Sequence, residues 1–495
     1  MISLQPNSAD AAHEHQSVCE RRGNLRISSE ESSTADGMMM FHLRCFSFQN
    51  VHTICGDKMQ NSIWADQSAL PEFPRLERDL KTDVLIIGGG LAGILCAYQL
   101  AQDGVDYALI EADRVMGGVS RNTTAKITSQ HGLIYEKLIR EFGVEKARLY
   151  WEVNEAALQR YRSIAQSIDC NFETKDNYIY SLYYPSNMET ELSALEKLHI
   201  PAEFADSVPL PIEVAGAIRF RDQAQFHPLK FVSQIAKGLN IYENTTAREF
   251  EGNVVLTDHG KITASKIIVA THFPILNKHG SYFLKMYQER SYVLALENAS
   301  DVDGMYLDEA KGGFSFRNFR NLLLLGGGSH RTGKPGNGWA DLESFAKTHY
   351  PNAKVVARWA TQDCMTLDGM PYIGQYSSRT PSLYVATGFN KWGMTASMAA
   401  GMILRDLVQE RENPYAQVFS PSRSILRPQL FANAFESTKN LLTFTKPRCP
   451  HLGCALKWNP QEHSWDCPCH GSRFTKDGIL LDNPATADLK KRRSQ

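Results

Sequence analysis

Residues 83–93 read Asp-Val-Leu-Ile-Ile-Gly-Gly-Gly-Leu-Ala-Gly, and this stretch decides the fold of the larger part of the chain. Its apolar half, Val84–Ile87, is short and unbroken, as strands buried in parallel sheets are. A helical stretch over about Leu91–Gln102 follows, and Gly104 marks its end. The next apolar run, Tyr107–Ile110, predicts a second strand, so the order is strand, glycine turn, helix and strand.

The glycines and one acid in this unit are those that a bound dinucleotide requires. Gly88 permits the tight turn, Gly90 lets the backbone approach a pyrophosphate, and Gly93 lets helix and strand pack closely. Free N–H groups at the helix start can bind the phosphates, and Glu111 can accept hydrogen bonds from ribose hydroxyls. The unit therefore predicts a dinucleotide site, against the alternative of a bare structural turn. We expect contacts from Gly88, Gly90, Leu91, Ala92, Gly93 and Glu111.

Three later segments favour FAD over NAD. The polar loop 117–126 can place N–H and hydroxyl donors beside the pyrophosphate, unless it is an ordinary loop. The strand-like runs 266–271 and 383–389 end in small residues, and a helix over about Met394–Val408 follows. The amino end of that helix can stabilise negative charge on a reduced flavin. Further contacts are expected from Gly118, Ser120, Thr124, Ala270, Gly388, Gly393, Met394 and Thr395.

The carboxyl end contains two Cys/His pairs, Cys449-Pro450-His451 and Cys467-Pro468-Cys469-His470, with fifteen residues between them (452–466). Two thiolates and two imidazoles suit a [2Fe–2S] centre with cysteines on one iron and histidines on the other. Zinc also binds Cys₂His₂ sets, but zinc fingers have Cys-x₂-Cys and His-x₃-His spacing, and this chain has neither.

These pairs resemble the Rieske family. The resemblance implies that Cys449 and Cys467 bind one iron, whereas His451 and His470 bind the other. It places the reduction potential at about −150 to +300 mV, because imidazoles replace two thiolates.

The same resemblance implies a disulfide between Cys454 and Cys469, with free buried thiols as the alternative. Ser472 is expected to donate a hydrogen bond to a cluster sulfur, which raises the potential. Phe474 stands where the high-potential members carry a tyrosine, so one donor is lost and we expect a lower potential. Residues 483–486 resemble the proline loop that covers the cluster.

Residues from about 80 to 412 resemble FAD-dependent oxidoreductases of the D-amino-acid oxidase and glycine oxidase group. Besides the glycine turn, Asp368-Gly369-Met370-Pro371-Tyr372-Ile373-Gly374 and Ala386-Thr387-Gly388 carry this resemblance. Thr123-Thr124-Ala125-Lys126, His131-Gly132 and the Rieske pairs resemble the YhfW-like subgroup, in which a flavin domain is fused to a carboxyl-terminal Rieske domain.

The resemblance implies an α/β fold: a Rossmann-like FAD domain, an interleaved α+β substrate domain whose antiparallel sheet roofs the flavin, and a small all-β Rieske domain. We expect Ala432–Asn440 to be helical. The expected FAD parts are about 80–135, 215–275 and 355–412, the substrate parts about 136–214 and 276–354, the linker 413–448 and the Rieske domain 449–490.

Asp363 predicts the substrate class. In the amino-acid-oxidising members, an arginine shortly before the Asp-Gly-x-Pro motif clamps the substrate carboxylate, and the register puts Asp363 there. A carboxylate repels such a substrate and attracts an ammonium group. We therefore expect an amine or amino-acid-like C–N substrate, unless Asp363 is a solvated loop residue. The sequence identifies no catalytic acid or base, and Tyr242, Tyr287 and Arg317 are interpreted as ordinary strand residues.

A flavin beside a one-electron cluster favours a dehydrogenase that passes electrons singly to the cluster and on to an unidentified one-electron acceptor. The alternatives are an O₂-using flavin oxidase and a non-catalytic redox sensor or electron carrier. A Rieske oxygenase would need a mononuclear iron site after the cluster, and only about 25 residues follow His470.

Net charge, apolar runs and cysteine content indicate which partners the protein can bind and in which compartment it resides. The net charge of −1 shows no basic surplus for nucleic acid, and no run of about 18 apolar residues indicates a membrane span. The ten cysteines do not form a secreted disulfide framework, so we predict a cytoplasmic protein. Residues 1–58 show neither periodicity nor a signal peptide. We expect a disordered or spurious extension, with translation from Met59 as the second possibility.

Overall fold

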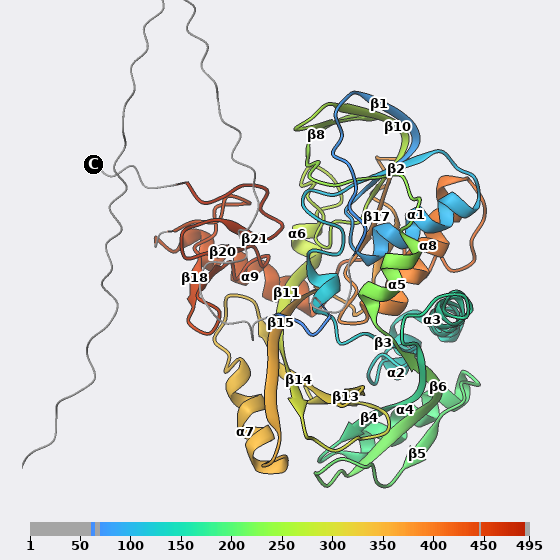
Figure 1. Cartoon of the computed structure of the whole chain (residues 1–495), viewed down its shortest axis with the longest axis vertical. Coiled ribbons are helices and arrows are strands. Elements are labelled where there is room, and N and C mark those ends of the chain that lie inside the picture. Colours follow the sequence, from blue (N-terminus) through green and yellow to red (C-terminus); the bar gives the residue numbers. More distant parts are fainter. Residues whose placement is uncertain (1–60, 65–69, 445–446, 491–495) are drawn as a thin grey trace, which may run out of the picture. The chain divides into compact units, whose positions relative to one another are not determined.

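The computed structural model describes residues 61–64, 70–444 and 447–490, so the prediction for residues 1–58 lies outside the described part. All described residues belong to one unit, Asp57–Gln495. They form three sheets of eight, nine and four strands (Figure 1).

The eight-stranded sheet has the order β16-β17-β10-β1-β2-β7, with β9 and β8 attached beside β10. β1 lies parallel to β10 and to β2, and β17 and β7 continue the parallel arrangement outward. The strands are β1 (Leu80–Ile87), β2 (Tyr107–Ile110), β7 (Ile241–Tyr242), β8 (Ala247–Glu251), β9 (Val254–Thr257), β10 (Lys261–Val269), β16 (Tyr372–Gln375) and β17 (Leu383–Thr387).

β1 is buried on both faces, as its unbroken apolar run predicts. Val84 and Ile86 join one hydrophobic core, whereas Leu85 and Ile87 join a second core on the other side. Helices α1 and α8 pack on each other within the first core, and α8 also packs on α3. The α-helices of the described residues are α1 (Leu91–Gln102), α2 (Tyr135–Phe142), α3 (Val144–Ala165), α4 (Pro185–Lys197), α5 (Pro228–Ile235), α6 (Tyr282–Lys285), α7 (Trp339–His349), α8 (Gly393–Val408) and α9 (Pro428–Leu442).

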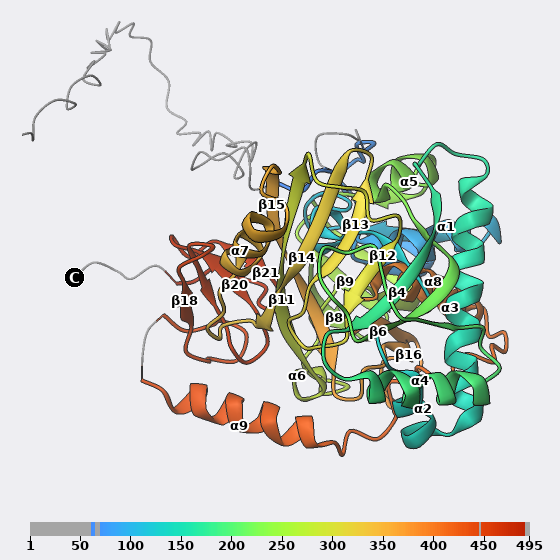
Figure 2. The same cartoon turned by 90° about the horizontal axis from the view of Figure 1, so that it is seen from below.

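The nine-stranded sheet has the order β15-β11-β14-β13-β12-β4-β6-β3, with β5 beside β6. It is antiparallel, as expected, except where β12 pairs in parallel with β4. Its strands are β3 (Lys126–Ile127), β4 (Glu173–Ser181), β5 (Glu203–Ala205), β6 (Gly216–Gln225), β11 (Met286–Glu297), β12 (Met305–Asp308), β13 (Ser315–Phe319), β14 (Leu322–Arg331) and β15 (Lys354–Thr366). Figure 2 shows β11, β14 and β13 side by side.

The long pair of β11 and β15 runs from Met286 opposite Thr366 to Glu297 opposite Lys354. β15 and β6 belong to this sheet, although the sequence prediction placed their residues in the FAD parts. The division of the chain into FAD and substrate parts therefore stays a proposal.

The four-stranded sheet is small and antiparallel, and it closes over its own core of cysteines, Leu456 and Phe474. Its strands are β18 (Lys457–Asn459), β19 (Ser464–Asp466), β20 (Arg473–Thr475) and β21 (Leu480–Asp482). Before it, α9 contains the predicted helical residues Ala432–Asn440 and extends beyond them at both ends. Across residues 61–64, 70–444 and 447–490, no helix is long and apolar enough to cross a membrane.

Gly93 tests the packing of the glycine turn. A Cβ at this position would lie 1.9 Å from the carbonyl oxygen of Gly88, so backbone must move. Gly93→Ala should lower the free energy of unfolding by about 3 kcal/mol or more, since overpacking commonly costs 1–3 kcal/mol. Thermal unfolding of the FAD-free protein measures the effect. Gly118→Ala is the control, because a Cβ there meets open space; equal stability of the two variants would contradict the expectation.

Candidate functional site: a flavin edge and a cluster edge

The carboxyl ends of four parallel strands bring together residues that are far apart in the sequence. Gly88 follows β1, Glu111 follows β2, Ala270 follows β10 and Gly388 follows β17. Backbone hydrogen bonds join the turn across the edge, from Gly88 N to Ile110 O (2.9 Å) and from Ala270 N to Ile87 O (2.8 Å). Ligands of open α/β sheets bind at this edge, outside the carboxyl ends of the strands.

The glycine turn is shaped by close approaches. Gly88 has φ +111°, and a Cβ there would lie 2.6 Å from the carbonyl oxygen of Ala270. Ser120 lies over the start of α1, where its hydroxyl accepts a hydrogen bond from Leu91 N at 3.0 Å. A Cβ on Gly90 would lie 3.3 Å from the same hydroxyl. The predicted cofactor-binding residues Gly90, Leu91, Ala92, Gly93 and Ser120 are therefore gathered at one helix start.

Glu111 lies beside this turn with its carboxylate fixed. Its two oxygens accept hydrogen bonds from Gly89 N (2.6 Å) and from Asp113 N (3.0 Å). Burial raises the pKa of Glu111, and these N–H donors act in the opposite direction. The carboxylate is thereby held at the end of β2, where an acceptor for ribose hydroxyls is expected.

The amino end of α8 is the second contact region predicted for FAD. Gly393 and Met394 begin the helix, and the Thr395 hydroxyl lies 3.0 Å from His131 Nε2. The His131 ring stacks on Trp392 with 4.7 Å between centroids. Burial lowers the pKa of His131 to about 3, so this imidazole is neutral and acts in packing and hydrogen bonding.

The loop that contains the predicted residues Gly118 and Thr124 is anchored from elsewhere in the chain. The Arg317 guanidinium donates to Thr124 O at 2.6 Å and to Ala125 O at 2.9 Å. Trp64 Nε1 donates to Thr123 O at 2.8 Å. Arg317 therefore holds this loop, which agrees with its interpretation as a structural residue.

An anchor that the sequence analysis missed joins the Asp-Gly-x-Pro motif to the predicted linker. Arg423 donates to both carboxylate oxygens of Asp368, at 2.6 and 2.9 Å. Arg423 also donates to Pro371 O at 2.8 Å. Nothing in the sequence marks Arg423, since a buried partner of this kind is specified only by tertiary contact.

Asp363 lies in β15 and not in a solvated loop. It pairs across the sheet with Glu289 of β11, so both carboxylates project from the same face. Lys391, just before α8, binds Glu289 at 3.0 Å. Burial raises the pKa of Asp363 to about 6, whereas Lys391 lowers it and Glu289 raises it further. This face of the sheet therefore carries two carboxylates, and lysines from outside the two strands, Lys391 and Lys311, bind Glu289.

Two loops with the same hydrogen-bond pattern form the cluster edge: the first cluster loop is residues 449–454 and the second is residues 467–472. Cys449 N bonds Cys454 O (2.9 Å) in the first loop, and Cys467 N bonds Ser472 O (2.8 Å) in the second. Each loop turns at a glycine with positive φ, Gly453 at +79° and Gly471 at +86°.

The predicted iron ligands face each other across these loops. The neighbouring Cys467 thiol raises the pKa of Cys449, and the rings of His451 and His470 have centroids 5.0 Å apart. Within the described residues, the buried Nδ1 atoms of both histidines and the Nε2 atom of His470 have no hydrogen-bond partner. Buried polar atoms are rarely left unpaired, so these three orphaned nitrogens beside two thiols fit a bound metal cluster.

The histidine environments also suit metal ligation. His451 Nε2 lies 3.0 Å from Asn277 Oδ1, which makes Nε2 the donor and leaves Nδ1 as the ligand atom. Phe273 packs against both rings, and Phe283 packs against His470. Burial lowers the pKa of His451 to about 4 and that of His470 to about 3, so both imidazoles are neutral.

Cys454 and Cys469 are free cysteines in the structure, and the disulfide between them stays a prediction. With Cys467 they form a group whose sulfur atoms lie within 4.8 Å of one another. The orphaned imidazoles favour the ligand set with two histidines over this all-sulfur group. Ser472 is fully buried, and its hydroxyl accepts a hydrogen bond from Ala485 N at 3.0 Å.

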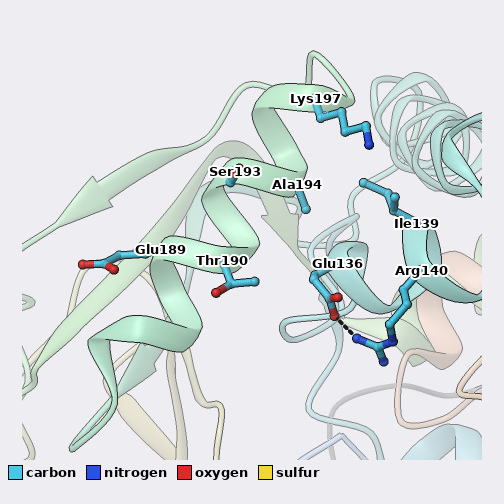
Figure 3. A pocket seen from close by; sticks show the side chains of 8 residues that line it. All are labelled: Glu136, Ile139, Arg140, Glu189, Thr190, Ser193, Ala194 and Lys197. Carbon is cyan, nitrogen blue, oxygen red and sulfur yellow. Dashed lines mark hydrogen bonds and ion pairs between the residues drawn. The ribbon is translucent and has the colours of Figure 1, made fainter.

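A separate groove of about 490 Å³ lies between α2 and α4 (Figure 3). Its charged side chains include the ion pair of Glu136 and Arg140. All of its lining residues belong to these two helices, so the groove is distinct from the flavin and cluster edges. They are Glu136, Ile139, Arg140, Glu189, Thr190, Ser193, Ala194 and Lys197.

Comparison with known proteins identifies both parts. The family model of FAD-dependent oxidoreductases matches residues 83–407, and that of the Rieske [2Fe–2S] domain matches residues 429–493. The chain belongs to the FAD-dependent oxidoreductase family and carries a carboxyl-terminal Rieske domain. It is an oxidoreductase of the amino-acid oxidase type, with FAD and a [2Fe–2S] cluster as cofactors.

Relatives share this organisation to different extents. The chain is 36% identical to "Putative Rieske 2Fe-2S iron-sulfur protein YhfW" of Bacillus subtilis (strain 168), over 86% of this chain and 96% of that protein. It is 24% identical to gamma-glutamylputrescine oxidoreductase of Escherichia coli (strain K12), over 70% of this chain and 88% of that protein. Glycine oxidase from Geobacillus kaustophilus shows the same fold, with a TM-score of 0.60 at 19% identity over 70% of this chain and 99% of that chain.

Phe474 tests the tuning of the cluster. It is fully buried in the core of the cluster domain, where a tyrosine hydroxyl could donate to a cluster sulfur. Phe474→Tyr should raise the reduction potential by roughly 20–60 mV, because a hydrogen bond contributes about 0.5–1.5 kcal/mol. Redox titration followed by EPR measures the shift, and Phe474→Leu, which adds no donor, is the control. An unchanged or lower potential in the tyrosine variant would refute the expectation.

Proposed function

We propose that this enzyme oxidises an amine or amino-acid-like C–N substrate and passes the electrons singly to the Rieske cluster. From the cluster they go to a one-electron acceptor. Bound FAD supplies an acceptor for two electrons that can release them one at a time. The proposal also places the enzyme in the cytoplasm, which the scattered cysteines support.

The observation that carries the substrate assignment is the pair of Asp363 and Glu289 on one face of the nine-stranded sheet. The resemblance to the amino-acid oxidases predicts an arginine at position 363, and this chain offers a carboxylate instead. Glu289 is neutralised by Lys391 at 3.0 Å and Lys311 at 3.4 Å, whereas Lys391 and Arg290 act on Asp363 through their charges alone. Asp363 is therefore the carboxylate left to bind a substrate ammonium group. The similarity to a gamma-glutamylputrescine oxidoreductase supports the amine class.

Asp363→Asn tests this assignment. Loss of a charged hydrogen-bond partner worth about 1.5–3 kcal/mol should weaken amine binding roughly 10- to 150-fold. Because burial raises the pKa of Asp363 to about 6, the wild-type carboxylate is charged above this pH and neutral below it. Wild-type affinity for the amine cation should therefore fall as pH drops through about 6. The variant should lack this acidic limb.

Anaerobic titration of flavin absorbance with amines, between pH 5 and 8, measures both effects. Glu343→Gln is the control, since Glu343 is an exposed carboxylate paired with Arg358 on the outer surface. If small α-amino acids bind tightly and reduce the flavin rapidly while amines do not react, the amine assignment is wrong.

The electron route is tested by the cluster spectrum after substrate addition. Anaerobic protein mixed with an amine should lose flavin absorbance and then show the rhombic low-temperature EPR signal of a reduced [2Fe–2S] centre. Bleaching without this signal, followed by fast reoxidation in air, would identify an O₂-using oxidase instead. Absence of bleaching by every amine and amino acid would point to a redox sensor or carrier.

A further inference from the structure

Strand β11 contacts both the segment before α8 and the second cluster loop, because alternate side chains of a strand point to opposite faces of a sheet. On one face, Glu289 binds Lys391 just before α8. On the other face, Gln288 binds the backbone of the second cluster loop, residues 467–472. The thickness of one strand therefore separates the substrate-side carboxylates from the loop that carries His470.

Gln288 is the central residue of this contact and is 1% exposed. Its Nε2 atom donates to His470 O at 2.7 Å and to Asn483 O at 3.1 Å. Its Oε1 atom lies 3.2 Å from Nε2 of His272, which follows β10. One side chain thus joins a cluster ligand, the proline loop and the flavin edge.

Gln362 completes the arrangement from the neighbouring strand β15 and is also 1% exposed. Its Nε2 atom donates to Gly471 O at 2.9 Å and to Gln288 Oε1 at 2.8 Å. Its Oε1 atom accepts from the Thr332 hydroxyl at 3.0 Å. Gln288 and Gln362 together are called the glutamine clamp below. Because every polar atom of the clamp is paired, it favours a single geometry.

Two glycines allow the backbones to come close enough for the clamp. Gly471 has φ +86°, and a Cβ there would lie 2.6 Å from Gln288 Cβ. Gly333, after β14, has φ +74°, and a Cβ there would lie 2.6 Å from Pro468 N. Side chains at these positions would push the cluster loop away from the sheet.

Charged residues beside the glutamine clamp also join the cluster domain to the nine-stranded sheet. Arg290, on the clamp face of β11, forms a buried ion pair with Glu462, which also binds Arg473 at 2.8 Å. Arg331 donates to Pro468 O at 3.1 Å and to the backbone of Cys469 at 3.2 Å. Buried, hydrogen-bonded ion pairs of this kind are costly to break, so they resist separation of the loop from the sheet.

We propose that the glutamine clamp fixes the second cluster loop on β11, so that electrons cross from flavin to cluster without domain movement. This inference rests on the proposed function and identifies the residues that position the cluster. With FAD and the cluster bound, each transfer would remove one electron from the reduced flavin and reduce one ferric ion of the cluster to ferrous. The one-electron acceptor would reoxidise the cluster before the second transfer, and the flavin proton would go to solvent. No bond forms or breaks in the clamp, and Gln288 and Gln362 act as positioning residues.

The first test uses the unmodified full-length holoenzyme. A photochemical donor reduces the flavin in a flash, and absorbance follows the later bleaching of the cluster. A fixed cluster predicts a transfer rate that is independent of solvent viscosity. A rate that falls in proportion to added sucrose would show that domain movement limits transfer, and it would overturn the proposal.

The second test compares Gln288→Leu, Gln362→Leu and the double variant. Each should slow the transfer at least 10-fold and make it viscosity-dependent, while the EPR g values of the cluster remain unchanged. Gln225→Leu is the matched control, because Gln225 is equally buried but bonds Glu173 and Asn318 instead. Wild-type transfer rates in all three clamp variants would overturn the proposal, and if the variants fail to fold the viscosity test still decides it.

This design separates the inference from the proposed function. No substrate is used, so failure to oxidise amines leaves the transfer measurement intact. If both centres are present but the flavin never reduces the cluster, the proposed electron route itself is wrong. If transfer occurs but ignores the clamp, only the positioning role of Gln288 and Gln362 is wrong.

Discussion

The close packing of β11 on the second cluster loop is the constraint on which the arrangement of the two redox centres depends. Gly471 and Gln288 approach so closely that a single added methyl group would separate them. The strand that carries this contact also carries Glu289 on its opposite face. Because a strand cannot shift by one residue without exchanging its faces, the pairing of β11 with β15 fixes both surfaces at once.

The flavin edge follows from a different constraint, the parallel strands of the eight-stranded sheet. Their common direction brings Gly88, Glu111, Ala270 and Gly388 to one edge, although these residues span much of the chain. Arg423 then ties the Asp-Gly-x-Pro motif to the segment before the cluster domain. The segment that connects the FAD-dependent oxidoreductase region to the Rieske domain is thereby bound to the Asp-Gly-x-Pro motif.

Local sequence predicted much of this fold. The limits of α1 and β2 were predicted correctly, because the glycines of the turn and the apolar runs on either side of it indicate the same arrangement of strand, helix and strand. The Cys/His pairs indicated a cluster because few other sites need that spacing. Asp363 was found only through its register with a family motif, and the alternative of a solvated loop residue is wrong because β15 extends through it.

Contacts between distant segments could not be predicted. Gln288 and Gln362 are unremarkable glutamines in two strands, and only the folded chain places them beside His470 and Gly471. The anchor provided by Arg423 and the parallel pair of β12 and β4 are of the same kind. Such contacts arise from tertiary packing, which local propensity and periodicity do not encode.

The most direct measurement is the distance between the two centres in the full-length protein. Pulsed EPR of partly reduced samples reports the magnetic interaction between a paramagnetic flavin and the reduced cluster. A cluster clamped on β11 predicts one narrow distance distribution that is the same in buffers of low and high viscosity. A broad or two-peaked distribution would show that the cluster domain moves, and it would contradict the account.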